Sequence, residues 1–172
     1  MVVGGRFSKY AHFAALTHPY IVEVVAQAYL DNIYKLHGLP RSTVTDRDTI
    51  FLSSFWHTLF SVLGVDLHLS SSYHPQTNGQ TDMLNRCLEH YLRCLSMHNP
   101  KAWVHWLPMA EWWYNTTYHT ATQKTPFEVL YNQESPVHLP YLPGESSQED
   151  VDRTLQRREE MLKQVRQNLL KA

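Results

Sequence analysis

Short apolar runs separated by turn residues open the chain. The first run, Met1-Val2-Val3, and the second, residues 10–16, flank the sequence Gly4-Gly5-Arg6-Phe7-Ser8-Lys9. Two such runs joined by turn-forming residues predict a β-hairpin. Apolar residues then recur at helical spacing up to Gly38, a typical helix end, which predicts one helix. These residues are Ile21, Val24, Val25, Ala28, Ile33 and Leu36.

The next stretch predicts a strand, a helix and a second strand. Residues 42–46 are rich in β-branched side chains and end in an acid. Ser53 and Ser54 precede a helical apolar pattern that ends at Gly64, and residues 65–70 alternate with a period of two. Strands and helices that alternate in this order indicate an α/β fold.

The second half of the chain is mainly helical by the same criteria. An apolar stripe follows residue 82 and ends at Asn99-Pro100. The next helix carries four of the five tryptophans at helical spacing, which favours buried packing over a platform for base stacking. Thr125-Pro126 is a good helix start. The pattern predicts a core domain over residues 1–135, a proline-rich linker over 136–147 and an amphipathic helix over 148–172.

Two carboxylates flank the centre of this pattern. Asp46 ends the predicted strand 42–46, and Asp82 lies in the first turn of a helix that follows the loop 71–80. A strand end and a helix start can bring two carboxylates to one point, and Mg²⁺ takes such hard oxygen ligands. Arg86, one turn after Asp82, has two interpretations: it neutralises a DNA phosphate, or it forms a plain ion pair with Asp82.

The loop before Asp82 also has two interpretations. Its Pro, Asn and Gly residues simply turn the chain, or the loop contacts DNA. In the second case Gln76, Thr77 and Asn78 donate hydrogen bonds to phosphates or base edges. The sequence Asn115-Thr116-Thr117 matches a glycosylation acceptor, but the N-terminus has no secretion signal, so we discount it.

Composition narrows the class of protein. The chain has 172 residues, of which 43% are hydrophobic, and this is enough for a sizeable core. No apolar run is long enough for a membrane span, so we expect a protein of the nucleus or cytoplasm that is not secreted. The net charge is −1, so DNA affinity requires a local basic patch. The eleven histidines are scattered without a paired Cys/His spacing, which argues against structural zinc.

Several blocks of residues resemble the integrase catalytic core of Ty3/gypsy-type LTR retrotransposons, within the retroviral integrase superfamily. They recur in the family's order and spacing, and the resemblance covers about residues 2–135. The blocks are Arg6-Phe7-Ser8-Lys9-Tyr10-Ala11-His12-Phe13, Thr45-Asp46-Arg47-Asp48, Tyr73-His74-Pro75-Gln76-Thr77-Asn78-Gly79-Gln80-Thr81, Asn85-Arg86-Cys87-Leu88-Glu89 and Thr125-Pro126-Phe127-Glu128.

The resemblance implies an RNase H-like fold, a mixed sheet flanked by helices, here without its first strand. It also implies a polynucleotidyl transferase that uses Mg²⁺ or Mn²⁺ to join element DNA ends to target DNA, and a homodimer formed through core helices. Family members use three acids. Asp46 matches the second and Asp82 stands where the third is normally Glu, while the first lies on a strand upstream of Val2.

These departures lead to three hypotheses. The first is an integrase-core domain that binds nucleic acid but is inactive in strand transfer as this chain. The second is a domesticated, non-catalytic module that binds protein or DNA. The third is an active enzyme whose metal site is completed elsewhere. Asp48 is a weak candidate for a replacement ligand, because an extended turn does not direct it toward Asp46.

Overall fold

The computed structural model describes residues 1–45, 49–69, 79–96 and 99–171, and its elements follow the predicted order. β1 (Val2–Gly4) and β2 (Ala11–Phe13) form an antiparallel hairpin, and β3 (Ser42–Thr45) pairs in parallel with β4 (Asp66–Leu69). The helices are α1 (Val22–Tyr29), α2 (Lys35–His37), α3 (Ser54–Val62), α4 (Gly79–Ser96), α5 (Trp103–Thr116), α6 (Pro126–Tyr131) and α7 (Glu149–Lys171). A short 3₁₀ turn at Pro100–Ala102 precedes α5.

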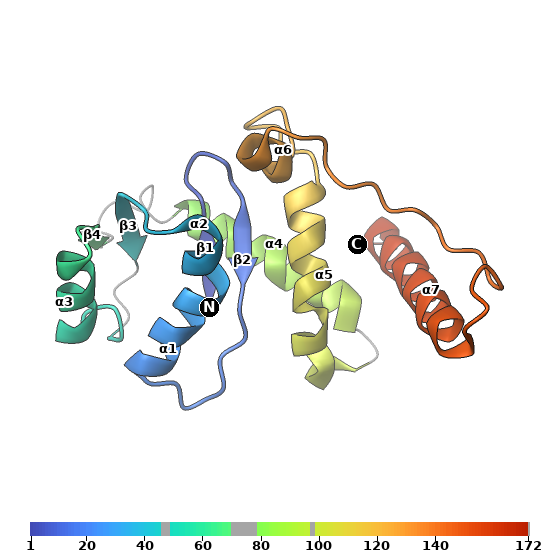
Figure 1. Ribbon diagram of the computed structural model, residues 1–172, viewed down its shortest axis with the longest axis horizontal. Helices are drawn as coiled ribbons and strands as arrows, with labels where there is room; N and C mark the ends of the chain where they lie inside the picture. The colour runs from blue at the N-terminus through green and yellow to red at the C-terminus, as the bar shows by residue number, and fades with distance from the viewer. Residues whose placement is uncertain (46–48, 70–78, 97–98, 172) are drawn as a thin grey trace.

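The sheet differs from the prediction of a single mixed sheet. Within the described residues the four strands form two separate two-stranded sheets, because no strand joins β1 to β3. Figure 1 shows the β3–β4 pair with α3 at one end of the molecule, the β1–β2 hairpin between α1 and α5, and α7 at the other end. The result is a mixed α/β fold with short strands.

The helix predicted over residues 21–36 is interrupted. A five-residue π-helical turn at Leu30–Tyr34 separates α1 from α2, and Gly38 ends α2 with a positive φ of 69°. A π turn adds a residue to the helical repeat and so rotates the side chains that follow it. This rotation is part of what determines the direction of His37, the last residue of α2.

Two apolar clusters hold these elements together. One packs β2 against α4 and α5 around Phe13, Leu84 and Ala110. The other packs α1 and the π turn against α3 around Val25, Trp56 and Phe60. Hydrophobic side chains of β1 contact both clusters, Val2 the first and Val3 the second. Alternate residues of a strand point to opposite faces, so β1 links the two halves of the core.

The C-terminal helix is tied to the segment that precedes it by polar contacts. The Tyr141 hydroxyl donates to Asp152 Oδ1 (2.7 Å), and His138 Nε2 lies 3.0 Å from Glu159 Oε1. α7 also contacts α4. Among the residues that the structure describes, none of the helices is both long and apolar enough to span a membrane.

Candidate functional site

Both strands of the parallel pair end at the same edge of their sheet. β3 ends at Thr45, directly before Asp46, and β4 ends at Leu69, directly before the loop that precedes α4. The carboxyl ends of parallel strands are common positions for binding sites. Asp46 itself, and the predicted DNA contacts Gln76, Thr77 and Asn78, lie outside the described residues.

Asp82 and Arg86 are both described. They lie one turn apart on α4, Asp82 in its first turn, and both side chains are exposed. The interpretation of Arg86 as a plain ion-pair partner of Asp82 is not observed: within the described part of the chain, neither side chain makes a salt bridge or hydrogen bond. On the same helix, by contrast, Arg93 Nη2 lies 2.7 Å from Glu89 Oε1. Arg86 therefore remains available to an anion.

The hairpin turn lies against the first turn of α4. The Gln80 side-chain amide donates to the Arg6 carbonyl oxygen (3.2 Å), and a Cβ added to Gly4 would lie 3.0 Å from Leu84 Cδ2. These contacts bring Arg6 and Lys9 to the end of α4 that carries Asp82. The sequence predicts residues 4–9 as a turn and includes Arg6 to Lys9 in a block shared with the family, but it does not predict that this turn lies beside α4.

The metal site implied by the resemblance is described only in part. Groups of three or more His, Cys, Asp or Glu side chains that could hold a metal do not occur within residues 1–45, 49–69, 79–96 and 99–171. Asp82 supplies one exposed carboxylate that has no partner among the described residues, and a carboxylate oxygen is a suitable ligand for Mg²⁺. Asp46, the second predicted metal ligand, lies outside the described residues.

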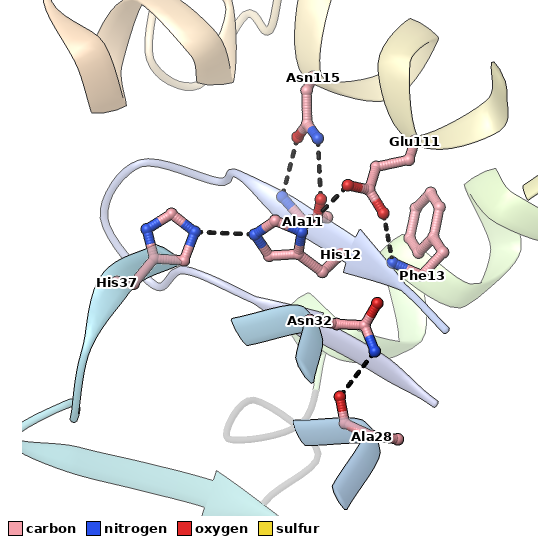
Figure 2. A network of polar contacts seen from close by, with 8 residues as sticks. All are labelled: Ala11, His12, Phe13, Ala28, Asn32, His37, Glu111 and Asn115. Atoms are coloured by element: carbon pink, nitrogen blue, oxygen red, sulfur yellow. Dashed lines mark hydrogen bonds and ion pairs between the residues drawn. The ribbon is translucent and has the colours of Figure 1, made fainter. Parts of the chain in front are cut away.

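A buried polar network lies on the other side of the hairpin (Figure 2). Ala11 donates its backbone N–H to Asn115 Oδ1 and accepts from Asn115 Nδ2, both at 2.8 Å. Phe13 donates its N–H to Glu111 Oε2 (2.8 Å), and His12 Nδ1 donates to Glu111 Oε1 (3.0 Å). Two side chains of α5, one turn apart, thus take the place of a neighbouring strand along the outer edge of β2. Asn115, which the sequence suggested only as a discounted glycosylation acceptor, has this structural role.

The same network extends to α2 through a histidine pair. His12 Nε2 and His37 Nε2 lie 2.8 Å apart, at hydrogen-bond distance. Burial, and to a lesser degree His12, lower the pKa of His37. Burial also raises the pKa of Tyr10 to about 12, and the Tyr10 ring makes a tilted contact with His12 and an edge-on contact with His37. None of these residues faces Asp82 or Arg86 in a described contact, so we assign the network to the fold.

The chain is similar in sequence to transposon polyproteins. No protein-family model matches the chain. The Tf2-3 and Tf2-4 transposon polyproteins of Schizosaccharomyces pombe are each 33% identical to it over 156 residues, or 87% of this chain. The chain spans only 12% of the length of these relatives.

Solved structures resemble the chain in fold. The simian T-cell lymphotropic virus intasome, solved in complex with the PP2A regulatory subunit B56γ, matches 86% of this chain and 53% of its own at a TM-score of 0.67 and 20% identity. The HTLV-2 integrase catalytic core with magnesium, in its trimeric form, covers 74% of this chain and 81% of its own, with a TM-score of 0.61 and 17% identity. The BIV integrase core covers 76% and 84%, with a TM-score of 0.61 and 18% identity.

Proposed function

We propose that this chain, which has the retroviral integrase catalytic-core fold and is homologous to the Tf2 (Ty3/gypsy) polyproteins over 87% of its length, is a DNA-binding integrase core. The observation that carries the proposal is the exposed face of α4, where Arg86 has no ion-pair partner among the described residues. An unpaired guanidinium is a suitable partner for a DNA phosphate. With a net charge of −1, the chain needs such local cations to bind DNA.

The proposed contacts divide into positioning and metal-binding groups. Arg86 neutralises a phosphate, and Gln76, Thr77 and Asn78 donate hydrogen bonds to the same DNA strand. Asp46 and Asp82 provide carboxylate ligands for Mg²⁺ or Mn²⁺. When bound, such ions polarise a phosphoryl oxygen and help a hydroxyl attack phosphorus. The role of this chain is then to hold the phosphate and orient it.

We propose that strand transfer by this chain is weak or absent, for a specific structural reason. By the family resemblance, Asp82 stands where a Glu is normal, and its side chain is shorter by one methylene. A carboxylate set back by one bond does not reach the same metal position without a shift of α4, and misplacement of this size is costly in catalysis. We therefore favour DNA binding with little or no joining activity over an active transferase. A domesticated, non-catalytic module is the alternative.

A homodimer is also part of the proposal. α5 leaves Trp103, Val104 and Trp112 partly exposed, although it is otherwise a core helix. Large apolar side chains that remain exposed on a packed helix indicate an interaction surface. A dimer formed through the core helices would cover these three side chains. Separately, a protein that acts on chromosomal DNA is expected in the nucleus.

The test compares two arginines of one helix. In Arg86→Ala the affinity for duplex DNA should fall, and the slope of log K against log salt should decrease by about one, because one phosphate contact is lost. Arg93→Ala is the matched control, since Arg93 is paired with Glu89 and should give wild-type affinity and slope. Fluorescence anisotropy over a series of salt concentrations measures both. Equal behaviour of the two variants would refute the α4 contact, and a wild-type chain without DNA affinity would refute the function.

A further inference from the structure

The turn between β1 and β2 exposes an unusual side chain. Phe7 is 90% exposed, more than any other large hydrophobic residue that the structure describes. Exposing an aromatic ring of this size to water is unfavourable, and the Phe7 ring packs in neither apolar cluster. Arg6, beside it, is also exposed, and its guanidinium makes no hydrogen bond or ion pair among the described residues.

The turn that carries Phe7 is well braced. Gly5 N–H donates to the Tyr10 carbonyl (2.8 Å), and Lys9 N–H donates to the Gly5 carbonyl (2.9 Å). Lys9 adopts a left-handed φ of 62°, and its ammonium donates to the Arg6 carbonyl at 3.0 Å. A Cβ on Gly5 would lie 2.6 Å from Ser8 Oγ, so a larger residue there would displace the Ser8 hydroxyl that accepts from Tyr10 N–H. A ring held outward by such a turn loses little conformational entropy when it binds a ligand.

We propose that this turn, residues 5–9, binds single-stranded nucleic acid, with Phe7 stacked on an unpaired base and Arg6 and Lys9 directed at the flanking phosphates. An exposed aromatic ring between cationic side chains is the combination that single-strand binding uses. The Lys9 ammonium donates one of its three protons to the Arg6 carbonyl, and its other two protons can donate to a phosphate. The inference rests on the proposed DNA-binding function and specifies the form of nucleic acid that this turn takes.

The location of the turn supports a nucleic-acid ligand. Gln80 ties the Arg6 carbonyl to the first turn of α4, the turn that carries Asp82, and Arg86 follows one turn later. A strand that stacks on Phe7 can therefore continue toward Arg86 of α4.

The experiment measures the binding of a fluorescein-labelled single strand and of the duplex of the same sequence by anisotropy. Phe7→Ala should weaken single-strand binding roughly tenfold and duplex binding much less, because paired bases do not reach the ring. Phe7→Trp should retain wild-type affinity, since a larger ring stacks equally well. Val137→Ala is the control for the loss of an exposed apolar side chain, because Val137 is 82% exposed in another part of the chain.

The outcomes separate this inference from the function on which it rests. If wild type binds DNA and Phe7→Ala behaves like Val137→Ala, the turn is not the single-strand site, although the proposed function stands. Equal losses on single strand and duplex would contradict stacking on an unpaired base. If the wild-type chain binds neither form, both proposals fail. Phe7 makes no core contact, so circular dichroism should show every variant folded.

Discussion

The two strand pairs of this fold are supported in different ways. β2 is buried along its length, and its outer edge is closed by hydrogen bonds from Asn115 and Glu111 of α5. The β3–β4 pair is largely exposed: Val44 is 40% exposed and Leu69 is 38% exposed. Side chains of α5 thus form hydrogen bonds with the free backbone edge of β2, whereas the β3–β4 pair packs on α3 through one face and leaves most of its residues exposed.

This difference coincides with the distribution of candidate functional residues. Asp46 follows β3, and the predicted DNA-contacting loop follows β4, so both leave from the exposed pair. The braced hairpin instead presents the turn with Phe7 and supports α4 through Gly4 and Leu84. Regions that bind ligands are commonly drawn from the less stable parts of a fold. The hairpin and α4 therefore form the braced side of the proposed DNA site.

The largest effect on this comparison should come from Asn115→Ala. Asn115 is 2% exposed and satisfies both backbone groups of Ala11. Its removal leaves a buried N–H and C=O without partners, which should cost roughly 2–5 kcal/mol in the free energy of unfolding. Urea denaturation measures this loss. Asn85→Ala, at an exposed position of α4, should change stability little, and similar values for the two variants would contradict the bracing of β2 by α5.

A smaller, pH-dependent effect should come from the histidine pair that joins β2 to α2. Burial lowers the pKa of His37 below its usual value of 6.5, so the unfolded chain binds more protons than the folded chain in this range. The contribution of neutral His37 to folding stability is therefore fully present when the pH is above the pKa of His37 in the unfolded chain. It is lost as the pH falls through the lower pKa of His37 in the folded chain. His37→Gln should remove this part of the acid sensitivity.

Melting temperatures at about pH 7.5 and about pH 5, on either side of the ordinary histidine range, measure that effect. The fall in melting temperature on acidification should be smaller in His37→Gln than in wild type. His90→Gln, at an exposed position of α4, should keep the full fall. An unchanged fall in His37→Gln would show that the link between His12 and His37 does not respond to pH.

The amino-acid sequence predicts the local elements well and the long-range contacts poorly. Apolar patterns and turn residues indicate the hairpin, the strands near residues 42–46 and 65–70, and α4. They place Asp82 in the first turn of α4 as the structure does, but they do not predict that β3 and β4 pair in parallel. The single sheet is wrong for the described residues, because strand pairing is not encoded in the period of one strand. The π turn at Leu30–Tyr34 escapes prediction because one added residue disturbs the helical spacing only slightly.

The polar network of Figure 2 was not predictable for a different reason. Asn115 and Ala11 are 104 residues apart in sequence, and His12 and His37 are 25 apart. Hydrogen bonds between a helix side chain and a strand edge have no sequence period. The only signal for Asn115 was its place in a glycosylation motif, which pointed to another role. Spacing also left open whether Arg86 pairs with Asp82, because the pair depends on rotamers that spacing does not determine.

The most direct test of the account is whether Mg²⁺ links Asp82 to DNA. Binding of duplex DNA by anisotropy, with and without Mg²⁺ at constant ionic strength, is compared in wild type, Asp82→Asn and the exposed control Asp66→Asn. We expect Mg²⁺ to strengthen binding by wild type and by Asp66→Asn. Asp82→Asn should bind more tightly than wild type without Mg²⁺, because a carboxylate no longer repels the phosphates, and Mg²⁺ should add nothing. An equal response to Mg²⁺ in all three proteins would contradict a metal-assisted DNA site at the start of α4.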